Sequence, residues 1–275
     1  MELIASSRIV KAQQRVEQSR PYAVQLTRAM VDVAANSGGS LQHPLLEERE
    51  DVRKAGVLVV TSDRGLAGAY SANALKEAEA TIASVTSRGL EPVLYVIGKK
   101  GVSYFRFRGR AMRGEWQGFS EVPRYDKAEE IGRTLINDFG EAEIDELHCI
   151  YTDFRSAFTQ RVTTKRFLPI ASNEVVGKGE GQVHAEYLFE PAASEILDYL
   201  LPQYLITKIW ASLLESAASE NSARRRAMKA ATDNAEELIK VYTRQANRAR
   251  QDEITTEIME IVGGAEALAA SGEEG

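Results

Sequence analysis

The chain has a single cysteine, Cys149, among its 275 residues, which excludes an internal disulfide and is compatible with a reducing, cytoplasmic compartment. No apolar run approaches the roughly 20 residues that a membrane-crossing helix needs. An excess of positive charge is also missing. The 34 Lys and Arg residues face 40 Asp and Glu residues, and the net charge of -6 disfavours bulk nucleic-acid binding.

Catalytic signatures are equally scarce. There is no Gly-x-Ser-x-Gly elbow, and His43, His148 and His184 lack the spacing of metal ligands. His148 and Cys149 are neighbours in an expected strand, so their side chains should point to opposite faces rather than form a nucleophile pair. The sequence therefore gives no positive case for catalysis, a metal site or a cofactor.

Glycine and proline are absent between Gln203 and Val262, a stretch rich in Ala, Leu, Glu, Lys and Arg. This composition predicts one very long helix from Pro202 to about Leu268, with Gly263 and Gly264 as the pair that ends it. Sixty residues at about 1.5 Å each would span roughly 90 Å, well beyond the width of a small domain. Such a helix needs a partner outside an ordinary core, which favours a mechanical or scaffolding role.

Two stretches of the chain carry small or apolar residues that alternate by fours and threes, the spacing of a coiled-coil stripe. In the C-terminal stretch these positions are Trp210, Leu214, Ala217, Asn221, Arg224, Met228, Ala231, Ala235, Leu238, Tyr242, Gln245 and Ala249. In the N-terminal stretch they are Ala5, Ile9, Ala12, Val16, Ser19, Ala23, Leu26, Met30 and Val33. The spacing predicts a close antiparallel hairpin of both termini, with a kink at Pro21.

Between these helices lies a segment in which strand and helix patterns alternate. The expected strands cover residues 56–62, 91–98, 145–152, 161–170 and 186–189, and the expected helices cover 71–85 and 125–139. This alternation predicts an α/β sheet. The predicted fold is an antiparallel coiled coil of long N- and C-terminal helices with an inserted Rossmann-like α/β domain. Its expected parts are residues 1–36, 53–190 and 192–268.

The turn after the first expected strand contains Asp63, Gly65 and Gly68. A strand-to-helix turn with two glycines is a place where a phosphate can bind at a helix N-terminus. However, the third glycine of a dinucleotide fingerprint and the Lys-Ser/Thr of a P-loop are both missing. We therefore favour a structural role for this turn, in which the glycines allow a tight bend and close packing.

Two basic clusters contrast with the acidic average. The first combines Tyr104, Phe105 and Phe107 with Lys99, Lys100, Arg106, Arg108, Arg110 and Arg113. A nucleic-acid surface, a docking patch for an acidic or polar protein, and a solvated edge all fit this pattern. The second cluster, Arg224, Arg225, Arg226 and Lys229, surrounds the long helix instead of forming one stripe, because successive helical residues point about 100° apart. That arrangement suits the inside of a surrounding collar.

Four segments of the sequence carry a family resemblance, namely MKAATDNA at residues 228–235, ITTEIMEIVGGA at 254–265, SDRGLAGAY at 62–70 and MELIASSR at 1–8. Together they resemble the gamma subunit of F-type ATP synthases. The four matches occur in the family's order and extend over essentially the whole chain. Together they are much more specific than any one of them.

The resemblance implies the rotor shaft of a bacterial-type ATP synthase. The paired helices would stand inside a hexamer of alpha and beta subunits, and the α/β domain would form a foot on the c-ring beside the epsilon subunit. Proton flow would turn ring and shaft, and chemistry would occur in the beta subunits. The resemblance implies no cofactor, no nucleic acid, and only indirect membrane attachment at the cytoplasmic face. The alternatives are a static coiled-coil tether and a nucleotide-dependent enzyme with a coiled-coil arm.

The family's contact positions transfer residue by residue. The shaft positions that would meet the hexamer are Arg224, Arg225, Met228, Lys229, Asp233, Asn234, Thr255, Thr256, Glu257 and Glu260. The foot positions that would meet the ring or epsilon subunit are Lys99, Lys100, Arg106, Arg108 and Arg110. For each shaft residue the competing interpretation is ordinary helix-surface or seam packing.

The family's N-terminal helix usually begins earlier, with a basic segment ahead of the part seen here. The coiled-coil stripe is already running at Ala5 and Ile9, with no N-cap signal before it. We therefore expect the true start to lie upstream of Met1. N-terminal mass spectrometry of the native protein tests this expectation, because a mature chain that begins at Met1 would contradict it.

Overall fold

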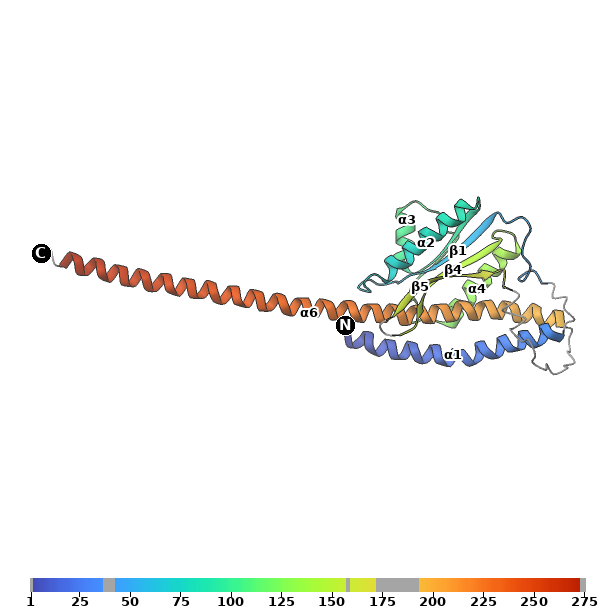
Figure 1. The fold of residues 1–275 in the computed structure, drawn as a ribbon, viewed down its shortest axis with the longest axis horizontal. Helices are drawn as coiled ribbons and strands as arrows, with labels where there is room; N and C mark the ends of the chain where they lie inside the picture. Colours follow the sequence, from blue (N-terminus) through green and yellow to red (C-terminus); the bar gives the residue numbers. More distant parts are fainter. Residues whose placement is uncertain (1, 37–42, 157–158, 172–192, 273–275) are drawn as a thin grey trace. The chain divides into compact units, whose positions relative to one another are not determined.

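A computed structural model describes residues 2–36, 43–156, 159–171 and 193–272 (Figure 1). These residues divide into two compact units, Met1–Ala227 and Met228–Gly275. The predicted boundaries at residues 36, 53, 190 and 192 follow a different criterion and stay predictions. The expected strand at 186–189 lies outside the described residues.

A five-stranded sheet with the order β3-β2-β1-β4-β5 forms the middle of the first unit (Figure 1). Its strands are β1 (Lys54–Val60), β2 (Glu91–Ile97), β3 (Gly114–Trp116), β4 (Glu146–Phe154) and β5 (Gln160–Leu168). The first four are parallel, and β5 pairs antiparallel with β4. Six of the seven β1 residues are buried, as expected for a central parallel strand covered on both faces. The predicted α/β class is confirmed.

One face of the sheet is covered by α2 (Tyr70–Ser87) and α3 (Lys99–Phe107). Ala74, Ala78, Ile82 and Val85 of α2 recur at helical spacing and pack in one cluster with alternate residues of β1. Helix α3 and strand β3 were not expected from the sequence, because residues 99–113 were interpreted as a basic patch. The helix instead buries Val102 and Phe105 and exposes the charges.

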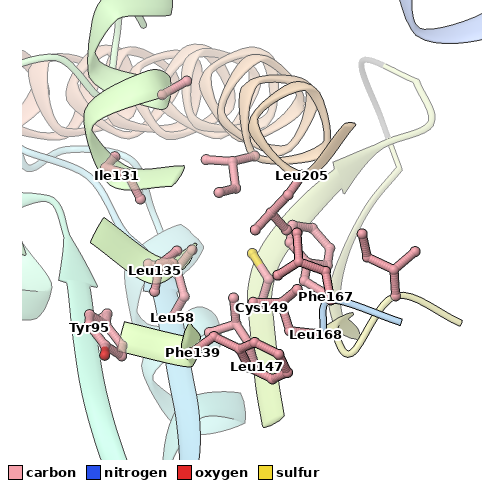
Figure 2. Close-up of a cluster of buried hydrophobic side chains, with 14 of the residues drawn as sticks. Leu58, Tyr95, Ile131, Leu135, Phe139, Leu147, Cys149, Phe167, Leu168 and Leu205 are labelled. Atoms are coloured by element: carbon pink, nitrogen blue, oxygen red, sulfur yellow. The ribbon is translucent and has the colours of Figure 1, made fainter. Parts of the chain in front are cut away.

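The opposite face is covered by α4 (Tyr125–Gly140) and by the first part of α6 (Ala193–Gly272). Figure 2 shows Ile131, Leu135 and Phe139 of α4 together with Leu205 of α6 and Cys149 of β4 in one buried cluster. The long helix is therefore part of the α/β core itself.

The helix α1 (Glu2–Asn36) packs antiparallel to α6 within the first unit. Successive pockets between them are lined by Ser19 with Trp210, by Ala12 with Leu214, and by Ala5 with Asn221, so residue numbers rise on one helix as they fall on the other. The predicted seam is buried at six α1 positions, namely Ala5, Ile9, Ala12, Leu26, Met30 and Val33. Small residues at the seam let the two helices approach closely.

The expectation that Gly263 and Gly264 end the long helix was wrong, because α6 continues to Gly272. The helix begins at Ala193, before Pro202 and next to the start at residue 192 in the predicted division. Neither glycine adopts a positive φ. A glycine in a helix costs only about 1 kcal/mol, so it ends the helix only when the backbone turns left-handed. α1 continues through Pro21, and the expected kink at this residue stays a prediction.

Candidate functional site

The turn that joins β1 to α2 is organised by the carboxylate of Asp63. Its Oδ1 accepts a hydrogen bond from the backbone N–H of Lys99 at 3.0 Å, and its Oδ2 accepts one from that of Ser120 at 2.9 Å. The hydroxyl of Ser120 in turn accepts from the backbone N–H of Asp63 at 2.8 Å. One side chain thus ties the end of β1 to the start of α3 and to the loop before α4.

The two glycines of this turn differ in conformation. Gly68 has a φ of 55° and Leu66 a φ of 61°, so the chain makes a left-handed bend here that favours glycine. Gly65 has no positive φ, and a Cβ added there would meet only the end of the Lys100 side chain at 3.8 Å. The carbonyl oxygen of Gly65 does contribute, because it accepts hydrogen bonds from Arg224 at 3.4 Å.

Arg224 belongs to a buried ion cluster. Its Nη2 lies 2.7 Å from Oε1 of Glu220, and its Nη1 lies 3.3 Å from Oε1 of Glu121. Glu121 also pairs with Arg8 of α1 and lies 3.7 Å from Arg64 of the turn. Arg224 is only 5% exposed, and its role as a shaft contact stays a prediction. The cluster joins α1, α6 and the β1–α2 turn.

Two glutamates of α6 sit in environments that disfavour charge. Burial raises the pKa of Glu220 to about 7, although Arg224 favours the charged form. Burial and the neighbouring Asp153 raise the pKa of Glu215 to about 7, against the attraction of Lys165 and Arg20. Sequence reasoning missed both groups, because their neighbours come from distant parts of the chain.

The basic stretch at 99–113 is largely neutralised within its own domain. Arg106 pairs with Glu115 at 3.0 Å, and Arg108 and Arg110 approach Glu79 at 3.6 and 2.8 Å.

Arg113 of the same stretch binds Asp138 at 2.8 Å. Burial acts to raise the pKa of Asp138, but hydrogen bonds from Arg113 and Tyr95 outweigh it and lower that pKa. Lys99 and Lys100 are exposed at the start of α3, and Phe107 at its end is 92% exposed. The ion pairs of the arginines weaken the case for a nucleic-acid surface. The exposed surface that remains consists of Lys99, Lys100 and Phe107.

The remaining predicted shaft residues lie on α6, with Arg225 in the first unit and the others in the second. Lys229 and Asp233 form an i,i+4 pair at 3.5 Å, while Met228 is half-buried. The other residues of this set are exposed, namely Arg225, Asn234, Thr255, Thr256, Glu257 and Glu260.

Large apolar side chains share the second unit with these residues. They are Leu238, Ile239, Val241, Tyr242, Ile254, Ile258, Met259, Ile261 and Val262, each at least 36% exposed. Exposed apolar groups in this number on one helix are typical of an interaction surface.

Helix α6 also packs against β4 near the carboxyl end of that strand. Its Ser216 hydroxyl accepts from the backbone N–H of Thr152 at 3.3 Å, and its Ser219 hydroxyl donates to the Thr152 carbonyl at 3.2 Å.

The described residues contain no group of three or more His, Cys, Asp or Glu that could hold a metal ion. None of their helices is long and apolar enough to cross a membrane.

Comparison with known proteins gives consistent matches over the whole chain. A family model described as ATP synthase matches residues 1–268. The ATP synthase gamma chain of Acidothermus cellulolyticus is 54% identical, and the alignment covers 100% of this chain and 92% of that protein. The corresponding chains of Salinispora tropica and Mycolicibacterium smegmatis are 52% and 50% identical, with 100% and 98% of this chain and 92% of each relative covered.

Solved structures share the fold at much lower identity. A chain of the Tetrahymena thermophila mitochondrial ATP synthase structure of the central stalk and c-ring matches with a TM-score of 0.64 and 20% identity, over 84% of this chain and 97% of that one. A chain of the Euglena gracilis mitochondrial enzyme, in a structure of OSCP, F1 and c-ring, matches with a TM-score of 0.58 and 14% identity, over 98% and 95%.

Proposed function

Because this chain belongs to the family of ATP synthase gamma chains, we propose that it is the rotating central-stalk subunit of a bacterial-type enzyme. It couples proton-driven rotation of a c-ring to ATP synthesis or hydrolysis in a hexamer of alpha and beta subunits. The family membership carries this proposal, and the surface of the second unit supports it.

The observation that fits a shaft best is the contrast along α6. Up to Ala227 the helix is built into the core of the first unit, through residues such as Leu205 and Leu213. From Met228 onward its large apolar side chains are exposed, as Tyr242 and Ile258 are. A helix that is anchored at one end and uncovered at the other is suited to transmit force into a surrounding partner.

The coupling works through differential contact. As the shaft turns, each orientation presents a different set of side chains to each beta subunit and so favours a different conformation of it. The proposed contact residues of the second unit are Met228, Lys229, Asp233, Asn234, Thr255, Thr256, Glu257 and Glu260. Arg225 is exposed beside them, whereas Arg224 acts from within the buried cluster as their support.

The α/β domain, residues 53–190 in the predicted division, is the proposed foot on the c-ring and epsilon subunit. Exposed Lys99, Lys100 and Phe107 are its best contact candidates, because the arginines of the same stretch already have acidic partners. The proposed location is peripheral, at the cytoplasmic face of the cell membrane, with the c-ring as the only link to the lipid.

Co-expression with alpha and beta subunits from the same source tests the proposal. We expect one copy of this chain per hexamer and ATPase activity that depends on it. Tyr242→Ser and Ile258→Ser should lower that activity. Lys76→Ser, at an exposed position of α2 in the first unit, should not lower it. A complex whose ATPase rate is the same with and without the chain would support the static tether instead. ATP turnover by the isolated chain would support the enzyme alternative.

A further inference from the structure

The chain between α1 and β1 makes a turn at residues 43–46 that reaches the core of the first unit. The backbone N–H of Leu46 donates to the carbonyl of His43 at 2.9 Å, which closes the turn. Leu45 is 4% exposed and lies in the buried cluster that also contains residues of α1 and α6. Its carbonyl accepts a hydrogen bond from the backbone N–H of Ile170, just after β5, at 2.8 Å. The turn therefore joins both terminal helices to the end of the sheet.

The imidazole ring of His43 holds this turn from its own first position. Its Nδ1 accepts a hydrogen bond from the backbone N–H of Leu45 at 3.0 Å. Its Nε2 lies 3.3 Å from Oδ1 of Asp198 on α6. A ring nitrogen that accepts a hydrogen bond carries no proton, so the proton of the neutral ring is on Nε2 and faces the Asp198 carboxylate. The two contacts fix one tautomer of a neutral imidazole.

A second proton on this ring would have to bind Nδ1. The Nδ1–H group and the backbone N–H of Leu45 would then be two donors that face each other at 3.0 Å, with no acceptor between them. Leu45 is buried, and buried backbone N–H groups without a partner are rare in folded proteins. The protonated ring and the closed turn therefore exclude each other.

The groups around the ring act on its charge in opposite directions. Burial lowers the pKa of His43 below its ordinary value of 6.5, and it outweighs the negative charges of Asp198 and Glu47, which raise this pKa. The His43 side chain is 11% exposed, whereas that of Asp198 is 70% exposed, so solvent screens the carboxylate. Strand β5 contributes Arg166 to this region, and its charge is paired with Glu48 at 2.8 Å. The neutral ring is thus the form that the folded protein favours at neutral pH.

We propose that His43 is a pH-sensitive clasp, which holds the turn at residues 43–46 against α6 and the end of β5 while its ring is neutral and releases the turn when the ring gains a proton. Because the pKa is lowered on folding, the folded protein binds fewer protons at this ring than the unfolded chain does. The stabilisation is therefore complete above pH 6.5 and is lost as the pH falls through the lowered pKa of the folded state. The clasp lies in the first unit and does not depend on the proposed rotor function.

Two substitutions of His43 separate the roles of its ring nitrogens. His43→Asn keeps the acceptor, because Oδ1 of asparagine is the same number of bonds from Cα as Nδ1, and asparagine at the start of a turn commonly accepts from the backbone N–H two residues on. It does not titrate in this pH range. His43→Gln places its amide near the position of Nε2 and offers no acceptor at the position of Nδ1. The first variant should hold the turn at every pH, and the second should hold it at none.

Hydrogen exchange at the Leu45 amide of the full chain, followed by NMR from about pH 8 to about pH 5, tests the clasp. The result is expressed as protection relative to an unfolded peptide, since the intrinsic exchange rate itself depends on pH. In the wild type we expect protection to fall about tenfold as the pH drops below 6.5. In His43→Asn it should change by less than about twofold over this range, and in His43→Gln it should be low throughout.

The matched control is His148→Gln. His148 is the other described histidine, and it pairs with Glu146 on β4 at 3.0 Å. This substitution should leave the pH profile of the Leu45 amide unchanged. A Leu45 protection factor that stays constant in the wild type would overturn the clasp. The same follows if His43→Asn loses protection in parallel with the wild type, because another group would then control the turn. Full protection in His43→Gln would show that Nδ1 does not hold the Leu45 amide.

Discussion

The buried Arg224 of α6 and the half-buried Glu121 of the loop before α4 form an ion pair, with 3.3 Å between Nη1 and Oε1. Glu121 is the only described carboxylate that joins Arg8, Arg64 and Arg224, which come from three separate parts of the chain. The pair therefore holds both terminal helices against the β1–α2 turn.

Glu121→Gln should lower the free energy of unfolding by about 2–4 kcal/mol, because it leaves buried guanidinium charge without its shared partner. Asp126→Asn is the matched control, since it breaks an exposed pair with Arg124 and should change stability by less than about 0.5 kcal/mol. Urea denaturation monitored by circular dichroism measures both. Equal small effects of the two substitutions would show that the cluster contributes little.

The buried Glu215 predicts how the free energy of unfolding should change with pH. Its pKa of about 7 in the folded chain lies above the ordinary value of 4.5, owing first to burial and then to Asp153. Between these pH values the folded protein keeps a proton that the unfolded chain has lost. The stabilisation from this group is thus complete below pH 4.5 and is lost as the pH rises through 7.

Glu215→Gln should therefore unfold like the wild type near pH 4.5 and be about 2–3 kcal/mol more stable at pH 8. Urea denaturation at pH steps from 4.5 to 8 measures the difference. Glu253→Gln, at an exposed position of the second unit, should leave the pH profile unchanged. The stability of Glu215→Gln should still fall somewhat as the pH rises, because burial raises the pKa of Glu220 to a similar value. A profile parallel to the wild type would contradict the prediction.

Gly132 of α4 lies directly against Ile206 of α6. A Cβ at this position would lie 2.6 Å from Cγ1 of Ile206. Gly132→Ala should destabilise the protein by about 1–3 kcal/mol, because the clash outweighs the gain in helix propensity. Gly140→Ala in the same helix meets no atom within 4 Å and should be neutral or slightly stabilising. Thermal denaturation compares the two, and a stabilising Gly132→Ala would mean that the helices can move apart.

Substitution of Asp63 tests whether its side chain holds the turn between β1 and α2 in place. Asp63→Ala removes two acceptors of backbone hydrogen bonds, from Lys99 and Ser120, and should cost about 2–3 kcal/mol. Asp63→Asn keeps one oxygen and should recover part of that loss. Hydrogen exchange at the Lys99 and Ser120 amides gives the direct measurement. Unchanged protection of both amides in Asp63→Ala would show that the turn holds without this side chain.

The hairpin and the sheet were predictable because periodicity reports burial directly. Met30 and Val33 lie in the core as their spacing indicates, and the apolar run of β1 is the central strand. Pairs of residues that are distant in the sequence and meet only in the folded structure were not predictable. Nothing in the sequence near Arg110 indicates Glu79, and nothing near Arg224 indicates Glu121. The turn at Asp63 lacks the residues of a P-loop, but its contact with Arg224 of α6 could not be predicted from the sequence.

The two parts of α6 should differ in how fast their backbone amide hydrogens exchange with solvent. Backbone hydrogens before Ala227 are protected by side chains in the core and should exchange with solvent only when the whole first unit unfolds. Those after Met228 are protected by the helix alone and should exchange far faster, by fraying from the free end. In the isolated protein, the slowly exchanging amides before Ala227 therefore serve as an internal reference, and the rapidly exchanging amides after Met228 report on partner binding. Any partner that covers Tyr242 or Ile258 should slow the second set of hydrogens and leave the first unchanged.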